Sequence, residues 1–555
     1  MPSRHPGRTT GPFSSGSGPA ARKGAQGSCG HRLGSDLPRN GLFQPGSVYV
    51  LFGPALSVRG SADRAIPRFD WGPAFIGSCE LDATMLGRIH RYLRPRRRLV
   101  LTVAAVGSVV AVIVAAIALL PSAPPGGPLP TVNATLRPGA GVGTVGPGFF
   151  AVSAQSDFLS SPVTQSLVER TPLTVFRWGP QGEYVNLTTG VQYNDNGIAG
   201  PIGPDNISSF IAFCRAVHCR ASLAVPGEIN DTRIAVATVT YIEQTLGFRP
   251  AYWSVGNEPQ TWNHFNEPWV DWRSSDASHV TPTEYALEVQ RYISAIRTVD
   301  PTAQFVGIQS AGGDSVEASQ WIAPVAQING PNLAFVAYHP YPGGNGATGA
   351  SLTDFFGSLT RSTAFPLGYP SAQQTIDAAC ACGVRLIAGE FNSALGGGYA
   401  PYLAGYPNVP YIGAGLLLAM EEGVPQVTYF TLSTPGPGFG LLEGETPRPT
   451  YYLYSVFLEN LTQGTVVSAS LPGAPAQVYA LETVNGSRTS LFVVNANPSV
   501  NVELNLTGSG FPVAGGGTVY SWDPSAALPT VASVTGALPS TYRVPAEGVL
   551  LLDVG

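Results

Sequence analysis

Two glutamates in this chain of 555 residues stand at the C-terminal ends of short apolar runs. Glu258 follows the run AYWSV and a Gly-Asn pair, and Glu390 ends the run VRLIAGE. Two facing carboxylates can cleave a glycosidic bond when one protonates the leaving oxygen and the other attacks or stabilises the anomeric carbon. The tripeptide Asn-Glu-Pro recurs at Glu267, which follows no apolar run. We therefore assign the chemistry to Glu258 and Glu390.

The segment that must position these glutamates, about residues 145–435, alternates short apolar runs with helical patterns. The eight runs are GFFAVSAQ, LTVFRWG, RASLAVP, AYWSVGN, AQFVGIQ, LAFVAYHP, VRLIAGE and QVTYFTL. The clearest helix begins at Thr281, where Pro282 and Glu284 complete a capping box. Eight such units predict a (β/α)₈ TIM barrel, which carries its chemistry at the C-terminal ends of its strands. Glu258 and Glu390 would then face each other across the mouth of the barrel.

The texture of the sequence changes after about residue 446. Two apolar runs joined at Asn485-Gly486 predict a β-hairpin, and further short strands follow. We predict a β-sandwich over 446–555 and a catalytic barrel domain over 131–445. The stretch 131–144 is a candidate for one further strand of the sandwich.

The N-terminal part contains one candidate membrane span. Residues 99–120 are uncharged and mostly apolar, and six arginines precede them in 85–98. As a helix this span would be about 33 Å long, enough for a hydrocarbon core of roughly 30 Å. The arginines predict a cytoplasmic N-terminus and an extracytoplasmic body. The alternative is a cleaved signal peptide and a secreted body.

The flanking segments have no globular pattern. Residues 121–130 are a Pro/Gly linker. Residues 1–84 have low complexity, and we interpret them as disordered or as untranslated, with Met85 as the natural start.

Charge and cysteine content exclude several classes of partner. Residues 126–555 hold 15 arginines and 30 acidic residues, which disfavours nucleic-acid binding.

Cys214 and Cys219 could form a small-loop disulfide, whereas Cys380 and Cys382 look too close in sequence for an easy bridge. No Cys/His cluster has zinc spacing, so we predict no metal and no organic cofactor.

The motifs WSVGNEP and GEFNSALGGG resemble the clan of glycoside hydrolases with the acid/base on strand four and the nucleophile on strand seven. Within the clan they look most like the heparanase and β-glucuronidase family. That resemblance implies a retaining mechanism, with Glu258 as acid/base and Glu390 as nucleophile. It also implies substrate contacts at further positions: Asn257 on the sugar 2-hydroxyl, a matching glutamine at Gln309, and glycines Gly396 and Gly397 whose backbone meets a sugar carboxylate.

Two positions depart from that family. Its tyrosine before the glycines is Leu395 here, and its acidic residue near the end of strand one corresponds to Gln155. The stretches VAYHPYPGG and FGLLEGETPRPTYYLYSVF resemble the β-xylosidase and iduronidase family of the same clan as closely. The sequence therefore identifies the clan and leaves the sugar open.

Other residues at strand ends and in the fourth loop are candidates for the pocket. Arg177 would hold Glu390 ionised or form a structural salt bridge. His339 and Tyr341 are expected to face the pocket, with Tyr341 donating to the nucleophile. Trp262, His264 and Trp269 could form a sugar-stacking wall in the fourth loop or simply pack there. Trp253 is an apolar neighbour of Glu258, and Phe430 and Phe439 are candidates for the floor of the site.

The sequence thus predicts a membrane-anchored retaining glycoside hydrolase that cleaves β-glycosidic bonds in extracellular oligo- or polysaccharides or glycosides. A transglycosylase on the same scaffold and a non-catalytic glycan-binding surface protein are the alternatives. The linkage, exo or endo action and the oligomeric state are left open.

Overall fold

The computed structural model describes residues 129–154, 158–179, 183–185, 192–194, 205–227, 230–262, 280–311, 318–359, 368–434 and 438–555. The predicted membrane span 99–120 lies outside these ranges. Within them, no helix combines the length and the apolar composition needed to cross a membrane.

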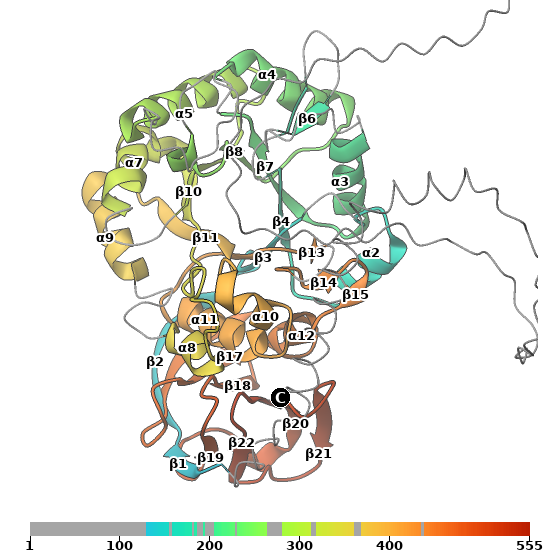
Figure 1. Ribbon diagram of the computed structural model, residues 1–555, viewed down its shortest axis with the longest axis vertical. Coiled ribbons are helices and arrows are strands. Elements are labelled where there is room, and N and C mark those ends of the chain that lie inside the picture. The colour runs from blue at the N-terminus through green and yellow to red at the C-terminus, as the bar shows by residue number, and fades with distance from the viewer. Residues whose placement is uncertain are drawn as a thin grey trace, which may run out of the picture. The chain divides into compact units, whose positions relative to one another are not determined.

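Eight parallel strands close into a barrel in chain order (Figure 1). Each strand matches one of the eight predicted runs to within one residue at its end, so the predicted barrel is confirmed. Most strand residues are buried, because helices cover the outside of a parallel barrel and side chains fill its inside. The strands are β3 (Phe150–Ser153), β4 (Val175–Trp178), β7 (Arg220–Val225), β8 (Tyr252–Val255), β9 (Phe305–Ser310), β10 (Leu333–Tyr338), β11 (Arg385–Phe391) and β12 (Val427–Tyr429).

The barrel interior is filled mainly by apolar residues of neighbouring strands. Val306, Ala337 and Ile387 form a small buried cluster, with Tyr252 and Phe335 packed against it. The core is therefore closed below the level at which the strands end. The site must lie above it, at the C-terminal rim.

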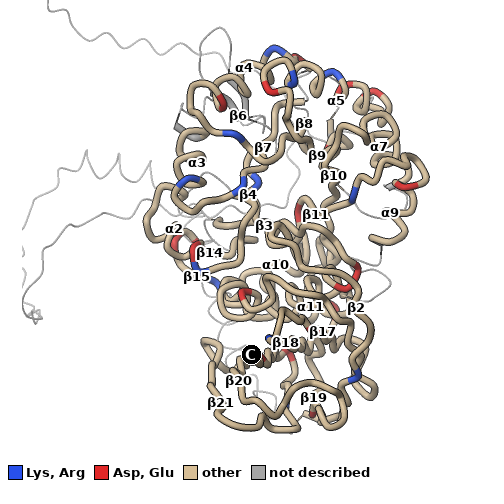
Figure 2. Tube along the Cα trace, turned by 180° about the vertical axis from the view of Figure 1, so that it is seen from behind, with Lys and Arg blue, Asp and Glu red and all other residues tan. Residues whose placement is uncertain are grey.

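Helices on the outside of the barrel complete the predicted units (Figure 1). They include α2 (Pro162–Val168), α3 (Asp205–Ala216), α4 (Thr232–Thr240), α5 (Pro282–Ile296), α7 (Ala323–Asn329) and α9 (Gly368–Ala379). Thr281 and Glu284 form the predicted capping box at the start of α5. Charged residues recur along these outer helices and are few along the C-terminal strands (Figure 2).

Helix α11 (Asn408–Glu421) lies between the barrel and the C-terminal sheets and is buried from Asn408 to Met420. A helix that is apolar on every side needs partners on every side. A Cβ added at Gly415 would lie 2.5 Å from the ring of Phe391 in β11, and one added at Gly413 would lie 3.2 Å from Val494. The two glycines let the barrel approach one face of the helix and the sheet approach the other. Helices α8 (Leu352–Gly357), α10 (Ala400–Leu403) and α12 (Pro449–Tyr452) are shorter.

The C-terminal strands form two sheets around a second apolar core. One has the order β2 (Arg137–Val145), β16 (Gly464–Ser470), β17 (Val478–Asn485), β18 (Arg488–Asn495), β23 (Val549–Val554), β20 (Gly517–Trp522) and β21 (Thr530–Val534). The other has the order β1 (Thr131–Thr135), β19 (Asn501–Asn505) and β22 (Thr541–Val544). The predicted hairpin joins β17 to β18, with Asn485 paired to Arg488.

Residues 131–145 contribute two strands to these sheets. β1 pairs in parallel with β19, and β2 pairs antiparallel with β16. The sequence-based division had assigned this stretch to the barrel segment, with one additional strand as an option. Both sheets therefore combine strands from before and after the barrel.

The structure contains two disulfides among the described residues. One joins Cys214 to Cys219, which the sequence left open. The other joins Cys380 to Cys382, against the expectation from their short separation. The chain turns between them, directly after α9, and their Cα atoms are 5.2 Å apart. That distance lies within the usual range for a bridge.

Candidate active site

Glu258 and Glu390 lie at the C-terminal rim of the barrel, as predicted from their positions after β8 and within β11. The backbone of Glu258 has a φ of 47° and its N–H donates to the carbonyl of Gln309 in β9 at 2.8 Å. This left-handed turn stops β8 and directs the residue to the barrel mouth. The Glu258 side chain is 28% exposed, whereas that of Glu390 is 7% exposed. One carboxylate is therefore open to solvent and the other is enclosed.

Glu390 is held by two donors from other strands. Arg177 of β4 donates to Oε1 at 2.6 Å, and the hydroxyl of Tyr341, after β10, donates to Oε2 at 2.8 Å. Burial alone would raise the pKa of Glu390, but the charges of His339 and Arg177 and the hydrogen bonds from Arg177 and Tyr341 together lower it. Burial and the Glu390 charge raise the pKa of Tyr341 well above its ordinary value. Glu390 is therefore ionised, and Tyr341 remains a donor.

The guanidinium of Arg177 also fixes Asn257. Its second terminal nitrogen donates to Oδ1 of Asn257 at 2.5 Å. Because Oδ1 is occupied in this way, the amide nitrogen of Asn257 is the end that remains as a donor. Both residues are buried. One cation thus orients an amide beside the acid/base position and a carboxylate at the nucleophile position.

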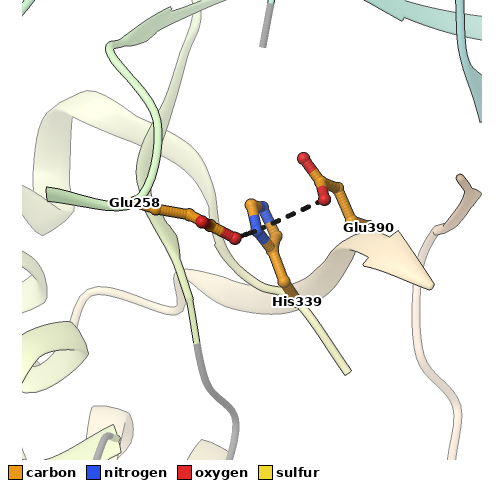
Figure 3. A group of neighbouring side chains, drawn as sticks. All are labelled: Glu258, His339 and Glu390. Carbon is orange, nitrogen blue, oxygen red and sulfur yellow. Dashed lines mark hydrogen bonds and ion pairs between the residues drawn. The ribbon is translucent and has the colours of Figure 1, made fainter. Parts of the chain in front are cut away.

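The imidazole of His339, which follows β10, lies between the two carboxylates (Figure 3). Its Nδ1 is 2.7 Å from Oε1 of Glu258 and 3.7 Å from Oε2 of Glu390. Its Nε2 is 3.2 Å from Oε1 of Gln309. A carbonyl oxygen only accepts hydrogen bonds, so Nε2 carries a hydrogen. The contact between Nδ1 and Glu258 then needs a further proton, on either the carboxyl group or the ring. This pair therefore holds a proton at the rim of the site.

Gly389 makes the position of Gln309 possible. A Cβ at residue 389 would lie 2.1 Å from Oε1 of Gln309 and 3.0 Å from Ala337. Any other residue directly before Glu390 would displace the glutamine from His339. The sequence analysis singled out Gln309 but not Gly389.

Glu258 and Glu390 approach closely enough to act on one atom. One oxygen of each carboxylate and Nδ1 of His339 all lie within 4.8 Å of one another. Two functions fit such a constellation: a pair of carboxylates about 5 Å apart in a retaining glycosidase, and three ligands for a metal ion. The sequence analysis predicted no metal ligands here.

Tyr341, Phe430 and Phe439 form an aromatic cluster beside Glu390, with ring centroids 5.6–6.4 Å apart. The buried amide of Asn392 donates to the carbonyl of Phe430 at 2.6 Å and to that of Phe439 at 3.3 Å. Asn392, two residues after Glu390, thus ties the end of β11 to the loop after β12. Sequence reasoning assigned it no role, although it stands in the quoted motif.

The glycine-rich loop after β11 is pinned to the loop after β10. The N–H of Gly343 donates to Ser393, that of Leu395 to Gly344, and that of Gly398 to Gly346. A Cβ at Gly397 would lie 1.7 Å from the carbonyl oxygen of Asn345, whereas at Gly396 nothing lies within 4 Å. Leu395 is 50% exposed.

Two tryptophans lie away from the carboxylates. Trp262 is 2% exposed, and its ring would collide with a Cβ at Gly256 or Gly227. Its indole N–H donates to the carbonyl of Asn257 at 2.9 Å. Trp262 therefore packs within the loop, which was the alternative to sugar stacking, and its hydrogen bond holds the backbone of Asn257. Trp253, expected beside Glu258, is instead buried in the main core, whereas its neighbour Tyr252 packs against the cluster inside the barrel. Alternate strand residues face opposite sides, so Trp253 lies on the helix side of its strand.

Four residues discussed from the sequence lie outside the described residues. They are Gln155, His264, Glu267 and Trp269.

Comparison with known proteins relates this fold to carbohydrate-active enzymes. No protein-family model and no curated protein matches the chain. The solved structures that match include a family 51 α-L-arabinofuranosidase from Bifidobacterium longum, at 15% identity and a TM-score of 0.55 over 77% of this chain and 100% of that chain. The family 51 arabinofuranosidase from Xanthomonas axonopodis pv. citri matches at 14% identity and a TM-score of 0.57, with the same coverage.

A third similar structure comes from another family. The xyloglucanase of glycoside hydrolase family 44 from Paenibacillus polymyxa matches at 12% identity and a TM-score of 0.53, over 76% of this chain and 99% of that chain. Families 51 and 44 belong to the clan that the motifs resemble. The chain therefore shares its fold with glycoside hydrolases of that clan over nearly the whole length of each neighbour.

Proposed function

We propose that this protein is a retaining glycoside hydrolase. The observation that carries the proposal is the approach of the Glu258 and Glu390 carboxylates to within 4.8 Å. Retaining enzymes place their carboxyl groups about 5–5.5 Å apart, whereas inverting enzymes leave roughly 6.5–9.5 Å for a water molecule. The shared fold with glycoside hydrolases of two families supports the same reaction class.

The two glutamates take different roles because their environments differ. Glu390 is enclosed, ionised and aimed by Arg177 and Tyr341, so it is the nucleophile that attacks the anomeric carbon. Glu258 is more exposed and shares a proton with His339, so it protonates the leaving oxygen as the bond breaks. The product of this step is a glycosyl ester on Glu390. Glu258, now a base, takes a proton from the water that hydrolyses the ester, and the configuration is retained.

The surrounding residues support these roles. Gln309 keeps a hydrogen on Nε2 of His339, so Nδ1 and Glu258 together hold the proton that the leaving group needs. Asn257, fixed through Oδ1, can donate from its amide nitrogen to the sugar hydroxyl beside the anomeric carbon. No step requires a metal or an organic cofactor.

For the substrate we propose a β-glycosidic bond in an oligo- or polysaccharide. The motif resemblance to the heparanase and β-glucuronidase family supports this bond. The neighbours include α-L-arabinofuranosidases and a xyloglucanase, so the sugar at the cleavage site has to be determined by assay. We also propose, from the apolar span 99–120 and its preceding arginines, that the catalytic body lies outside the cell membrane.

The test is hydrolysis of a panel of aryl glycosides by the full chain, with Glu390→Gln as the control. The panel contains β-glucuronide, β-xyloside, β-glucoside, β-galactoside and α-L-arabinofuranoside. We expect turnover of at least one, loss of turnover in the control, and a first product with retained configuration by NMR. An inverted product would refute the mechanism. Transfer to added sugars in preference to water would identify a transglycosylase. Binding of glycans without turnover of any aryl glycoside or polysaccharide would identify a binding protein.

A further inference from the structure

We propose that Glu258, His339 and Glu390 form an inhibitory site for a zinc-class divalent cation, which binds in competition with the sugar. This inference concerns regulation of the proposed active site and rests on the placement of the site given above. Figure 3 shows the three side chains converging on one another, Glu390 from β11 and Glu258 and His339 from the chain just beyond β8 and β10. Their nearest ligand atoms all lie within 4.8 Å of one another.

The distances fit a small cation after a modest shift of one side chain. Zinc binds His nitrogen and carboxylate oxygen at about 2.0–2.2 Å, so the ligand atoms of a tetrahedral site lie roughly 3.3 Å apart. Nδ1 of His339 is 2.7 Å from Glu258 and 3.7 Å from Glu390, which brackets that separation. Glu258 is the ligand that must move, and its side chain is 28% exposed, so it has room to do so.

The chemistry of the donors favours zinc over the hard cations. One imidazole with two carboxylates suits zinc and related transition metals, whereas calcium and magnesium prefer sets of oxygen ligands. Metal-bound histidines usually donate their other N–H to an oxygen that fixes the ring. Gln309 already supplies that oxygen at 3.2 Å from Nε2. The imidazole is thus oriented to present Nδ1 to a cation.

Charge also favours a cation, although two existing contacts oppose it. A cation that displaces the proton held by the Glu258–His339 pair leaves two ionised carboxylates against the one guanidinium of Arg177, and this net negative charge around Nδ1 holds the cation. Arg177 occupies Oε1 of Glu390, and Tyr341 already donates to Oε2, the oxygen nearest His339. A cation at Oε2 must share that oxygen with Tyr341. We therefore expect a site that is reversible and readily cleared by a chelator.

Occupation of this site blocks the proposed reaction directly. A cation bound to Glu258 and His339 replaces the proton that the leaving oxygen requires. The same cation engages the oxygen with which Glu390 would attack. Inhibition should therefore be competitive with substrate.

The experiment measures the binding of Zn²⁺ to the full chain by calorimetry. The binding of Co²⁺ to the full chain is followed by the visible absorption of the bound ion. These readouts need no substrate, so they test the metal site even if no glycoside is turned over. We expect His339→Asn and Glu258→Gln each to weaken Zn²⁺ binding at least tenfold and to abolish the Co²⁺ bands. His218→Asn, which removes an exposed histidine away from the site, is the matched control and should change neither. Mg²⁺ should not displace Co²⁺.

Circular dichroism establishes whether each variant is folded. If His339→Asn is not folded, Glu258→Gln alone tests the site. Zn²⁺ affinity that is unchanged in a folded site variant would overturn the proposal. Inhibition of an active enzyme by Zn²⁺ that is not competitive with substrate would overturn it as well. Absence of any Co²⁺ band in the wild type would do the same.

Discussion

Replacement of Arg177 by Met should destabilise the protein strongly, and replacement of Glu390 by Gln should relieve part of that loss. Arg177 contacts Glu390 at 2.6 Å and Asn257 at 2.5 Å, and all three residues are buried. Removing one partner of a buried ion pair leaves an uncompensated charge and costs roughly 3–5 kcal/mol. We expect the free energy of unfolding of Arg177→Met to fall by about that amount at pH 7.

In the double variant the uncompensated charge is gone, so about 2 kcal/mol or more should return. The recovery will be incomplete, because Oδ1 of Asn257 still lacks its donor, at a cost of about 1–3 kcal/mol. The exposed pair Arg233–Asp231 provides the control. Arg233→Met should cost less than about 1 kcal/mol. Chemical denaturation in the presence of EDTA gives the free energies of unfolding of the wild type, Arg177→Met, the double variant and Arg233→Met. The measurement needs no knowledge of the substrate.

The same experiment has a pH dependence with a defined sign. In the wild type the pKa of Glu390 is lowered, so its contribution to stability is present above the ordinary carboxyl pKa and is lost as the pH falls. Without Arg177, burial opposes the charge with less compensation, and protonation relieves the strain. The stability difference between wild type and Arg177→Met should therefore be smaller at pH 4.5 than at pH 8. The reasoning is refuted if Arg177→Met costs no more than the control, or if Glu390→Gln adds to its loss.

Three further predictions concern other contacts. Tyr341→Phe should lower kcat on any turned-over glycoside by about 10- to 150-fold, because a charge-assisted bond to the nucleophile is worth roughly 1.5–3 kcal/mol; an unchanged kcat would contradict this. Burial raises the pKa of Glu547 to about 7, so its contribution to stability is lost as the pH rises from the ordinary carboxyl range through 7. Glu547→Gln should therefore stabilise the protein more at pH 8 than at pH 5, by roughly 1–2 kcal/mol after allowance for partial exposure, and equal effects in denaturation at the two pH values would count against it. Tyr406→Phe removes a hydroxyl that donates to the carbonyls of Trp522 and Glu547 and should cost about 1 kcal/mol; thermal melting measures this, and no loss would mean that the bond contributes nothing net.

The parts of the structure that the sequence predicted depend on short-range patterns. Buried parallel strands are continuous apolar runs, so all eight barrel strands were visible, and the strand ends located Glu258, Glu390, His339 and Tyr341. The capping box of α5 was equally local.

The parts that the sequence did not predict depend on contacts between distant residues. Residue 389 must be glycine because a side chain there would collide with Gln309. Asn392 is needed as a donor to the carbonyls of Phe430 and Phe439. Neither requirement leaves a periodic signal in one chain. Trp253 was expected to be an apolar neighbour of Glu258 but faces the helix side, and a fully apolar run does not reveal which of its residues point inward. The sequence did not decide whether Trp262 stacks on a sugar or packs within its loop, since both roles need an aromatic ring.

The pairing of β2 with β16, from Val145 with Gly464 to Arg137 with Ser470, gives the chain an unusual order of assembly. In topological terms the barrel is an insertion within the sandwich. The sandwich can close only after the segment that forms the barrel has been synthesised, and its two flanks must find each other across that whole segment. Pairings so distant in sequence favour slow folding. A fragment cut at residue 445 would leave β1 and β2 without partners, with their edges exposed to other chains. The smallest unit expected to fold on its own therefore runs from about residue 129 to 555 and includes both the barrel and the sandwich.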